Sequence, residues 1–321
     1  MIHVLRRSRP LVAVVAALVA ALTLAGCGDS DDAGSDGKGA SAEKRTVQAT
    51  NGSVTVPANP KRIVAISYAA GALLDVGVVP IGTTKVEEPL ELTPEQTAQI
   101  SKSTEIGAGD QINLEKVAEL RPDLIIVEGA DFGWPIDKLG KIAPTLYFEV
   151  AKPSELVGAA EKIAQAVGKE AELKRLKDAY TAKIDQVKGA YAGPLKDNRF
   201  ALVSTYGDGK FYIGTRTSWM GQVLHSLGAG FAKESDRTDT HENEYSQEKI
   251  SSLADADVVL IGNSGGKLSP ATEEMLATSQ WKLLKAAKKN QVHGVNFSFA
   301  DRYTTLTAVL SQIETLLKGL G

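Results

Sequence analysis

The alternation of hydrophobic and polar positions predicts a long amphipathic helix in the middle of the chain. Between Lys169 and Tyr191, apolar residues recur at spacings of three and four, while charged and amide side chains fill the other positions. This is the pattern of a helix with one apolar stripe. No proline interrupts it before Pro194, so the helix is expected to reach about 35 Å at a rise of roughly 1.5 Å per residue.

Similar segments lie on either side of this helix and predict two related halves. Asn113–Val127 (NLEKVAELRPDLIIV) matches Ser246–Ile261 (SQEKISSLADADVVLI). In the same order, Arg62–Ile66 followed by Gly71–Gly77 matches Arg199–Ser204 followed by Gly221–Gly228. The first pair predicts a capped helix followed by a strand that is buried on both faces. The predicted fold is therefore α/β, with two Rossmann-like lobes that contain central sheets and are joined by one long helix.

The first 26 residues differ from the rest of the chain. Three arginines precede an apolar run at Leu11–Leu22, which is too short to span a bilayer comfortably. The run ends in LAGC at residues 24–27, and Cys27 is the only cysteine. This stretch resembles the lipobox of bacterial lipoproteins, which implies that Cys27 is acylated and becomes the new N-terminus. A plain signal peptide with an incidental cysteine is the alternative.

Composition adds limits on the fold and the partners. With 321 residues the chain has room for two domains, and its net charge of −3 gives no indication of a nucleic-acid partner. Gly28–Arg45 is rich in Gly, Ser, Asp and Ala, which is typical of a disordered tether. The predicted division is a signal peptide (1–26), a lipid anchor and flexible tether (27–45), an N-terminal lobe (46–168), the connecting helix (169–193) and a C-terminal lobe (194–321).

The mature chain resembles the iron-siderophore class of ABC-transporter substrate-binding proteins over nearly its whole length. The resemblance is carried by NPKRIVA at 59–65, GVVPIG at 77–82, NLEKV and RPDLII within 113–126, IAP at 142–144 and LATSQW at 276–281. It implies a ligand in the cleft between two lobes and only small lobe movements, since a helix that spans both lobes is stiff. It also implies a monomeric, lipid-anchored extracytoplasmic protein that delivers an iron(III)–siderophore to an ABC permease, without cofactor or catalysis.

Aromatic and arginine side chains follow several predicted strands, where loops face the crevice of an open α/β sheet. Aromatic faces suit the apolar arms of a siderophore, and arginine can donate to metal-bound oxygens. The resemblance to hydroxamate-siderophore binders places Phe132 and Phe299 in the cleft, while Arg302 beside Asp301 could instead be a solvated pair. With no residue expected to bind the metal directly, the predicted ligand-binding set is Tyr68, Phe132, Trp134, Tyr206, Arg216, Trp219, Phe299 and Arg302.

The chain departs from the family pattern where the permease would dock. Many members carry one Glu on the first helix of each lobe, which meets arginines of the permease. Gly71 and Gln222 stand at these positions. Neighbouring acids such as Asp75, Glu87 or Glu88 are the alternative docking residues.

Other functions stay open at this stage. Haem could use Tyr68 or Tyr206 as an axial ligand, and a corrinoid is a further alternative. The polar segment His241–Tyr245 is interpreted as a solvated loop rather than a metal site. Residues 262–266 (GNSGG) fit the G-x-S-x-G pattern of a hydrolase, with Ser264 as nucleophile and Glu273 or Glu274 with His293 completing a triad. However, Ser269 and Pro270 predict that the next helix begins later than a nucleophile elbow requires.

Overall fold

The computed structural model describes residues 43–320 apart from 86–90, 110 and 208. The predicted signal peptide, Cys27 and nearly all of the tether therefore lie outside the described residues. None of the helices in the described part is both long and apolar enough to cross a membrane. Because Ala42–Gly321 forms one compact unit, the lobe boundaries near residues 168 and 193 stay predictions.

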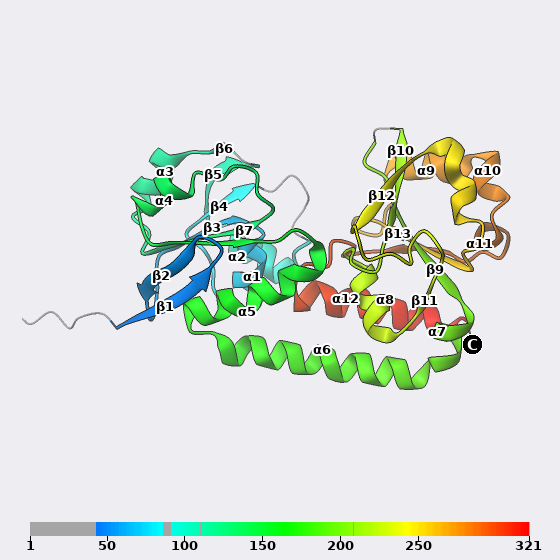
Figure 1. Cartoon of the computed structure of the whole chain (residues 1–321), viewed down its shortest axis with the longest axis horizontal. Helices are drawn as coiled ribbons and strands as arrows, with labels where there is room; N and C mark the ends of the chain where they lie inside the picture. The colour runs from blue at the N-terminus through cyan, green and yellow to red at the C-terminus, as the bar shows by residue number, and fades with distance from the viewer. Residues whose placement is uncertain (1–42, 86–90, 110, 208, 321) are drawn as a thin grey trace, which may run out of the picture. The chain divides into compact units, whose positions relative to one another are not determined.

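A six-stranded sheet forms the centre of the N-terminal lobe (Figure 1). Along the sheet the strands are β6 (Gln111–Ile112), β5 (Thr104–Ala108), β4 (Gly82–Lys85), β3 (Ile63–Ser67), β7 (Leu124–Gly129) and β8 (Thr145–Glu149). All neighbouring pairs are parallel except β5 and β6. A separate antiparallel hairpin precedes the sheet, with strands β1 (Lys44–Ala49) and β2 (Gly52–Pro57).

Helices cover both faces of this sheet. They are α1 (Ala69–Asp75), α2 (Pro94–Ile100), α3 (Leu114–Glu119), α4 (Ile136–Gly140) and α5 (Leu156–Val167), with a 3₁₀ turn η1 (Pro153–Glu155) before α5. Ile63 and Ala65 of β3 point into one hydrophobic core with α1 and α5, while Val64 and Ile66 point into another with α3 and α4. This two-sided burial explains why the strand reads as a continuous apolar run.

The C-terminal lobe contains a second six-stranded sheet. Its strands are β9 (Arg199–Ser204), β10 (Lys210–Gly214), β11 (Gly230–Phe231), β12 (Glu242–Ser246), β13 (Val258–Gly262) and β14 (Val292–Val295). The order is β12-β10-β9-β13-β14, with β11 also paired to β9. Its other elements are α7 (Ala192–Asp197), α8 (Gly221–Leu227), η2 (Gln247–Leu253), α9 (Pro270–Ala277), α10 (Ser279–Lys282), α11 (Lys285–Lys288) and α12 (Tyr303–Lys318).

The internal repeat appears as two equivalent strand pairs. β3 is parallel to β7, and β9 is parallel to β13. In both pairs an aspartate before the second strand accepts a hydrogen bond from a backbone N–H at the start of the first. Asp123 accepts from Arg62 at 2.9 Å, and Asp257 accepts from Arg199 at 3.1 Å. The same local device therefore aligns both strand pairs, which explains why the two sequence segments are alike.

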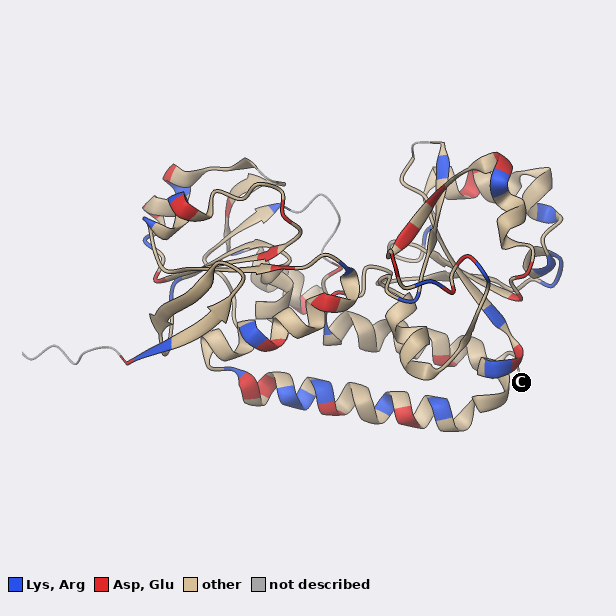
Figure 2. Cartoon of the chain, in the orientation of Figure 1, with Lys and Arg blue, Asp and Glu red and all other residues tan. Residues whose placement is uncertain are grey.

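The predicted long helix is α6 (Glu170–Ala190), which packs against α5 of the N-terminal lobe and against α8 and α12 of the C-terminal lobe. Leu173, Ile184 and Val187 are its buried residues. Lys, Arg, Asp and Glu residues are interspersed along the helix (Figure 2). The predicted fold class, two α/β lobes joined by one long helix, is therefore confirmed.

Two local predictions for the C-terminal lobe were wrong. The segment after Ser246 is a 3₁₀ helix, η2, rather than a capped α-helix, and the Ser246 side chain makes no capping hydrogen bond. Its counterpart Asn113 does cap α3, accepting from the Lys116 N–H at 3.0 Å. The segment interpreted as a loop at His241–Tyr245 contains most of β12, an antiparallel strand at the edge of the sheet. No residue of β12 is fully buried, so its sequence lacks the apolar signature of a strand.

Candidate ligand-binding cleft

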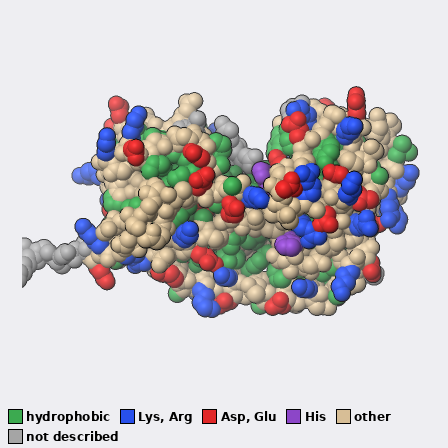
Figure 3. Space-filling view, viewed as in Figure 1, with side chains coloured by type: hydrophobic (Ala, Val, Ile, Leu, Met, Phe, Trp, Pro, Cys, Tyr) green, Lys and Arg blue, Asp and Glu red, His purple; other side chains and the backbone are tan. Residues whose placement is uncertain are grey.

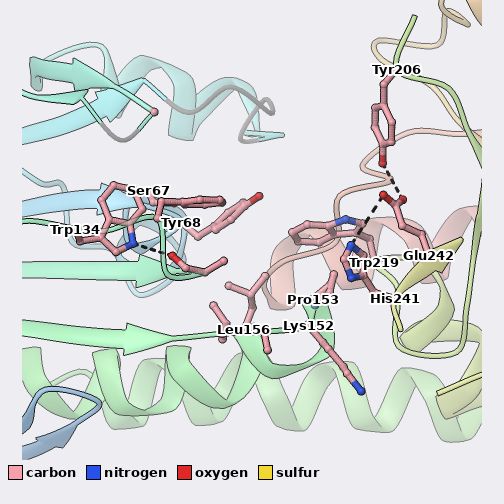
Figure 4. A pocket seen from close by; sticks show the side chains of 15 residues that line it. Ser67, Tyr68, Trp134, Lys152, Pro153, Leu156, Tyr206, Trp219, His241 and Glu242 are labelled. Atoms are coloured by element: carbon pink, nitrogen blue, oxygen red, sulfur yellow. Dashed lines mark hydrogen bonds and ion pairs between the residues drawn. The ribbon is translucent and has the colours of Figure 1, made fainter. Parts of the chain in front are cut away.

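A cavity of about 500 Å³ collects side chains from both lobes. The contributing segments lie at the carboxyl ends of β3, β5, β7, β8 and β9 or beside β12 and α8 (Figure 4). Fifteen of the described residues line it: Ser67, Tyr68, Gly109, Ala130, Phe132, Trp134, Val150, Ala151, Lys152, Pro153, Leu156, Tyr206, Trp219, His241 and Glu242. Five of the eight predicted ligand-binding residues are among them. We refer to this cavity as the cleft.

The turn between β3 and α1 places Tyr68 at the cleft. Ser67 has a φ of 60°, a conformation that non-glycine residues adopt rarely and at some cost. Its backbone N–H donates to the Thr84 hydroxyl at 2.9 Å, which holds the turn in place. Gly129 passes close by with a φ of 154°, and a Cβ there would lie 3.0 Å from the Ser67 hydroxyl. The sharp turn therefore depends on a small neighbour at Gly129.

An aromatic chain crosses the cleft from one lobe to the other. The Tyr68 and Trp219 ring centroids lie 5.6 Å apart, and those of Trp219 and Phe299 lie 5.5 Å apart in an edge-to-face arrangement. Such pairs are favourable beyond the area they bury. Phe299 does not line the main cleft. Its ring contacts the Trp219 ring, and it lines a second, smaller cavity, which we call the side cavity.

A second aromatic pair lies on the N-terminal lobe. Trp134 is 8% exposed, and its indole N–H donates to the Ala130 carbonyl at 2.8 Å. Phe132 stands on it edge-to-face with centroids 5.8 Å apart, and is itself 63% exposed. Trp134 is held by its hydrogen bond, and Phe132 packs on it. The Phe132 side chain therefore loses little conformational entropy when a ligand binds to its exposed ring.

The polar side of the cleft contains Tyr206, which was predicted, and His241 and Glu242, which were not. Tyr206 donates to Glu242 at 3.0 Å, and the His241 ring lies 4.0 Å from the same carboxylate (Figure 4). Across the cavity the Lys152 ammonium donates to the Thr238 carbonyl at 2.8 Å. The sequence predicts a solvated loop at His241–Tyr245, so neither His241 nor Glu242 is in the predicted ligand-binding set. Two alternating acids, Glu242 and Glu244, are too weak a pattern to indicate a strand without apolar residues between them.

The two predicted arginines do not reach the cleft. Arg216 forms an ion pair with Asp236, and its guanidinium lies 4.7 Å from the centre of the Phe231 ring. Its planar group is thus occupied by a carboxylate and an aromatic face within the C-terminal lobe. This leaves a ligand role for Arg216 without geometric support.

Arg302 is 1% exposed and lies in a buried cluster between the lobes. It donates to Asp301 at 2.6 Å, and its Nε lies 3.2 Å from Asp75, an ion pair that is not aligned as a hydrogen bond. Its remaining donor group reaches the Glu91 carbonyl at 2.7 Å and the Gln96 side chain at 3.2 Å. We call Asp75, Gln96, Asp301 and Arg302 the interlobe cluster. Neither interpretation of Arg302, as ligand contact or as solvated pair, agrees with this burial.

The interlobe cluster also changes the interpretation of the docking positions. Gly71 packs against it, since a Cβ there would lie 3.1 Å from an Asp301 carboxylate oxygen. Asp75 is 1% exposed at its side chain, so it is not available to a permease. Gln222 donates to the Ala300 carbonyl at 2.8 Å. Glu87 and Glu88 lie outside the described residues.

Comparison with known proteins identifies the family. Residues 63–297 match the family model described as "Periplasmic binding protein". This span covers well over half of the chain and includes both central sheets. The chain belongs to the periplasmic binding protein family.

Relatives of this periplasmic binding protein match it over most of their length. It is 27% identical to the Fe(3+)-citrate-binding protein of Bacillus subtilis, with 97% of each chain covered. It is 29% identical to the iron(3+)-hydroxamate-binding protein YxeB of the same organism, covering 89% of this chain and 88% of that one. A solved siderophore periplasmic binding protein from the fuscachelin gene cluster of Thermobifida fusca is 32% identical with a TM-score of 0.73, covering 82% of this chain and 98% of that one.

The described residues form neither a direct metal site nor a hydrolase site. No group of three or more His, Cys, Asp or Glu side chains in that part of the chain lies close enough to hold a metal ion. Ser264 is in a tight turn with Lys267, and α9 begins only at Pro270. His293 contacts Gln291 at 2.8 Å. The strand–Ser–helix geometry of a nucleophile elbow is therefore not formed.

Two carboxyl groups beside the interlobe cluster have raised pKa values. Burial raises the pKa of Glu91 to about 7, although its carboxylate accepts from the Phe299 N–H at 3.0 Å. Burial, with a contribution from the charge of Asp301, raises the pKa of Glu128 well above its ordinary value, and one of its oxygens has no hydrogen-bond partner. Both groups therefore favour the protonated form in the folded protein.

We expect Glu91 to make the protein less stable as the pH rises from about 4.5 to about 7. In this window the unfolded chain has lost the proton that the folded chain still holds, so the group's contribution favours folding below 4.5 and is lost above 7. Urea unfolding at several pH values should show a smaller decline for Glu91→Gln than for the wild type. Parallel curves for the two proteins would contradict the assignment.

Proposed function

We propose that this periplasmic binding protein binds an iron(III)–siderophore complex and delivers it to an ABC importer. The observation that carries the proposal is the cleft, whose aromatic walls come from both lobes and whose volume of about 500 Å³ suits a bulky chelate. The iron-citrate, iron-hydroxamate and siderophore binders among its relatives support the same class of ligand. The protein then acts by binding, with no resident cofactor.

The proposed location is the extracytoplasmic face of a bacterial membrane. Support comes from the LAGC sequence that ends at Cys27 and from relatives named as lipoproteins. The protein is proposed to be anchored through a lipid on Cys27 and to act as a monomer.

On the face seen in Figure 3, acidic and basic side chains are interspersed rather than gathered into a patch of one sign.

The direct test is a titration of intrinsic tryptophan fluorescence with ferric siderophores, haem and cobalamin. Trp134 and Trp219 line the cleft, so a bound ferric chelate is expected to quench them. Quenching by haem or cobalamin alone would favour the other ligand classes of the same fold. Absence of quenching by every ferric siderophore at micromolar concentration would refute the proposal.

We expect Phe132→Ala to weaken ligand binding by about 1–3 kcal/mol, because it removes an exposed aromatic contact. The free energy of unfolding should change by less than about 0.5 kcal/mol, as is usual at exposed positions. Leu283→Ala is the matched control, since Leu283 is 67% exposed but lies outside the cleft. Arg216→Ala is a second control, and its affinity should stay unchanged. Equal affinities for Phe132→Ala and Leu283→Ala would remove Phe132 from the site.

A further inference from the structure

The cleft has little positive charge to offer a ligand. Among its described lining residues, Lys152 is the one lysine or arginine, and its ammonium already donates to a backbone carbonyl. Arg216 and Arg302, the arginines predicted to reach it, are paired with aspartates elsewhere. A chelate with several negative charges would lose hydration on entering the cleft without gaining ionic partners there. The charge balance therefore disfavours a strongly anionic ligand.

Glu242 is the one acidic residue among the described residues that line the cleft. It lies on the edge strand β12, and its side chain is 24% exposed. Its Oε2 accepts from Tyr206, and its Oε1 lies 4.0 Å from the His241 ring. A carboxylate can accept about four hydrogen bonds, so these neighbours leave capacity for a further donor.

The side cavity, of about 40 Å³, lies beside the cleft at this carboxylate. Tyr206, Trp219 and Glu242 line both spaces, and Phe299 and Ser298 line only the side cavity. Its volume exceeds the roughly 10–15 Å³ that a cavity needs to hold one water molecule, so a group of the size of an ammonium fits. Trp219 and Phe299 are among the lining residues, and aromatic rings attract cations that lie over their faces.

We propose that Glu242 and the side cavity form a subsite for an ammonium group, so that the cleft prefers ferric chelates carrying a cationic arm. The proposal rests on the proposed function, since it concerns the ligand of the same cleft. The chelate core contacts the aromatic walls, while its alkylammonium arm enters the side cavity and donates to Glu242. A charge-assisted hydrogen bond of this kind is stronger than a neutral one.

A matched pair of probes tests this proposal. Ferrioxamine B carries one primary ammonium, and its N-acetylated form is neutral but otherwise alike, while ferric dicitrate is an anionic comparison. Isothermal titration calorimetry on the wild type should show ferrioxamine B binding at least about tenfold more tightly than the acetylated form. Ferric dicitrate should bind more weakly than both.

Two variants of β12 connect this preference to one side chain. Glu242→Gln should remove most of the preference, lowering affinity for ferrioxamine B about tenfold and leaving the acetylated form nearly unchanged. Glu244→Gln is the matched control, because it removes the same charge from the same strand but pairs with Lys210 and does not line the cleft. It should leave the preference intact.

The outcomes separate this inference from the proposed function. Equal binding of both ferrioxamines to the wild type, or an equal loss for both in Glu242→Gln, would overturn the ammonium subsite. Ferric dicitrate binding as tightly as ferrioxamine B would also overturn it, while leaving ferric-chelate binding in place. If no ferric chelate binds, both the subsite and the proposed function fail.

Discussion

Replacing Arg302 by alanine is expected to destabilise the protein by about 3–5 kcal/mol, because a buried charge pair would lose one partner. Asp75 and Asp301 would remain buried without the cation that faces them, and Asp301 already has a pKa raised by burial. The donors to Gln96 and to the Glu91 carbonyl would be lost as well. Since Arg302 is the N-cap residue of α12 and Asp75 ends α1, the change should also loosen the contact between the lobes.

Urea unfolding of the wild type and of two single variants tests this expectation. Lys174→Ala is the control, because Lys174 pairs with Asp178 on the exposed face of α6 and both side chains are more than half exposed. Exposed pairs of this kind contribute about 0.5 kcal/mol or less. A loss in Arg302→Ala no larger than that in Lys174→Ala would show that the interlobe cluster contributes little to stability.

The fold was predictable because its determinants are local and repeated. Buried parallel strands read as continuous apolar runs, and β3, β7, β9 and β13 all show this pattern. The amphipathic stripe of α6 is equally visible. β12 was not predictable in this way, because an edge strand with no fully buried residue lacks both an apolar run and a clear alternation.

In the candidate site, too, the residues that follow buried strands were predictable, and those placed by tertiary contacts were not. Tyr68 and Trp134 could be nominated because they follow buried strands whose carboxyl ends face the crevice. Arg302 was misplaced because its partner Asp75 lies far away in the sequence, on a helix of the other lobe. A charge pair that forms only through tertiary contact leaves no spacing or motif to read. Glu242 was missed for the related reason that its position depends on strand pairing.

Replacing Trp219 by alanine is expected to weaken ligand binding by about 2–4 kcal/mol, the range of an aromatic hot spot. Trp219 lies between Tyr68 and Phe299 and lines both the cleft and the side cavity, so its loss removes a contact surface and the support for two other rings. Affinity should be measured by calorimetry with a ferric siderophore, because the substitution also removes a fluorescent reporter.

Trp219→Phe is the conservative control, and it should retain much of the affinity by keeping an aromatic face between Tyr68 and Phe299. Circular dichroism and the urea midpoint would verify that each variant is folded. A folded Trp219→Ala protein with wild-type affinity would place the ligand outside the cleft. A loss of affinity in Trp219→Ala that Trp219→Phe largely restores would instead show that the aromatic chain between the lobes forms the wall on which the ligand rests.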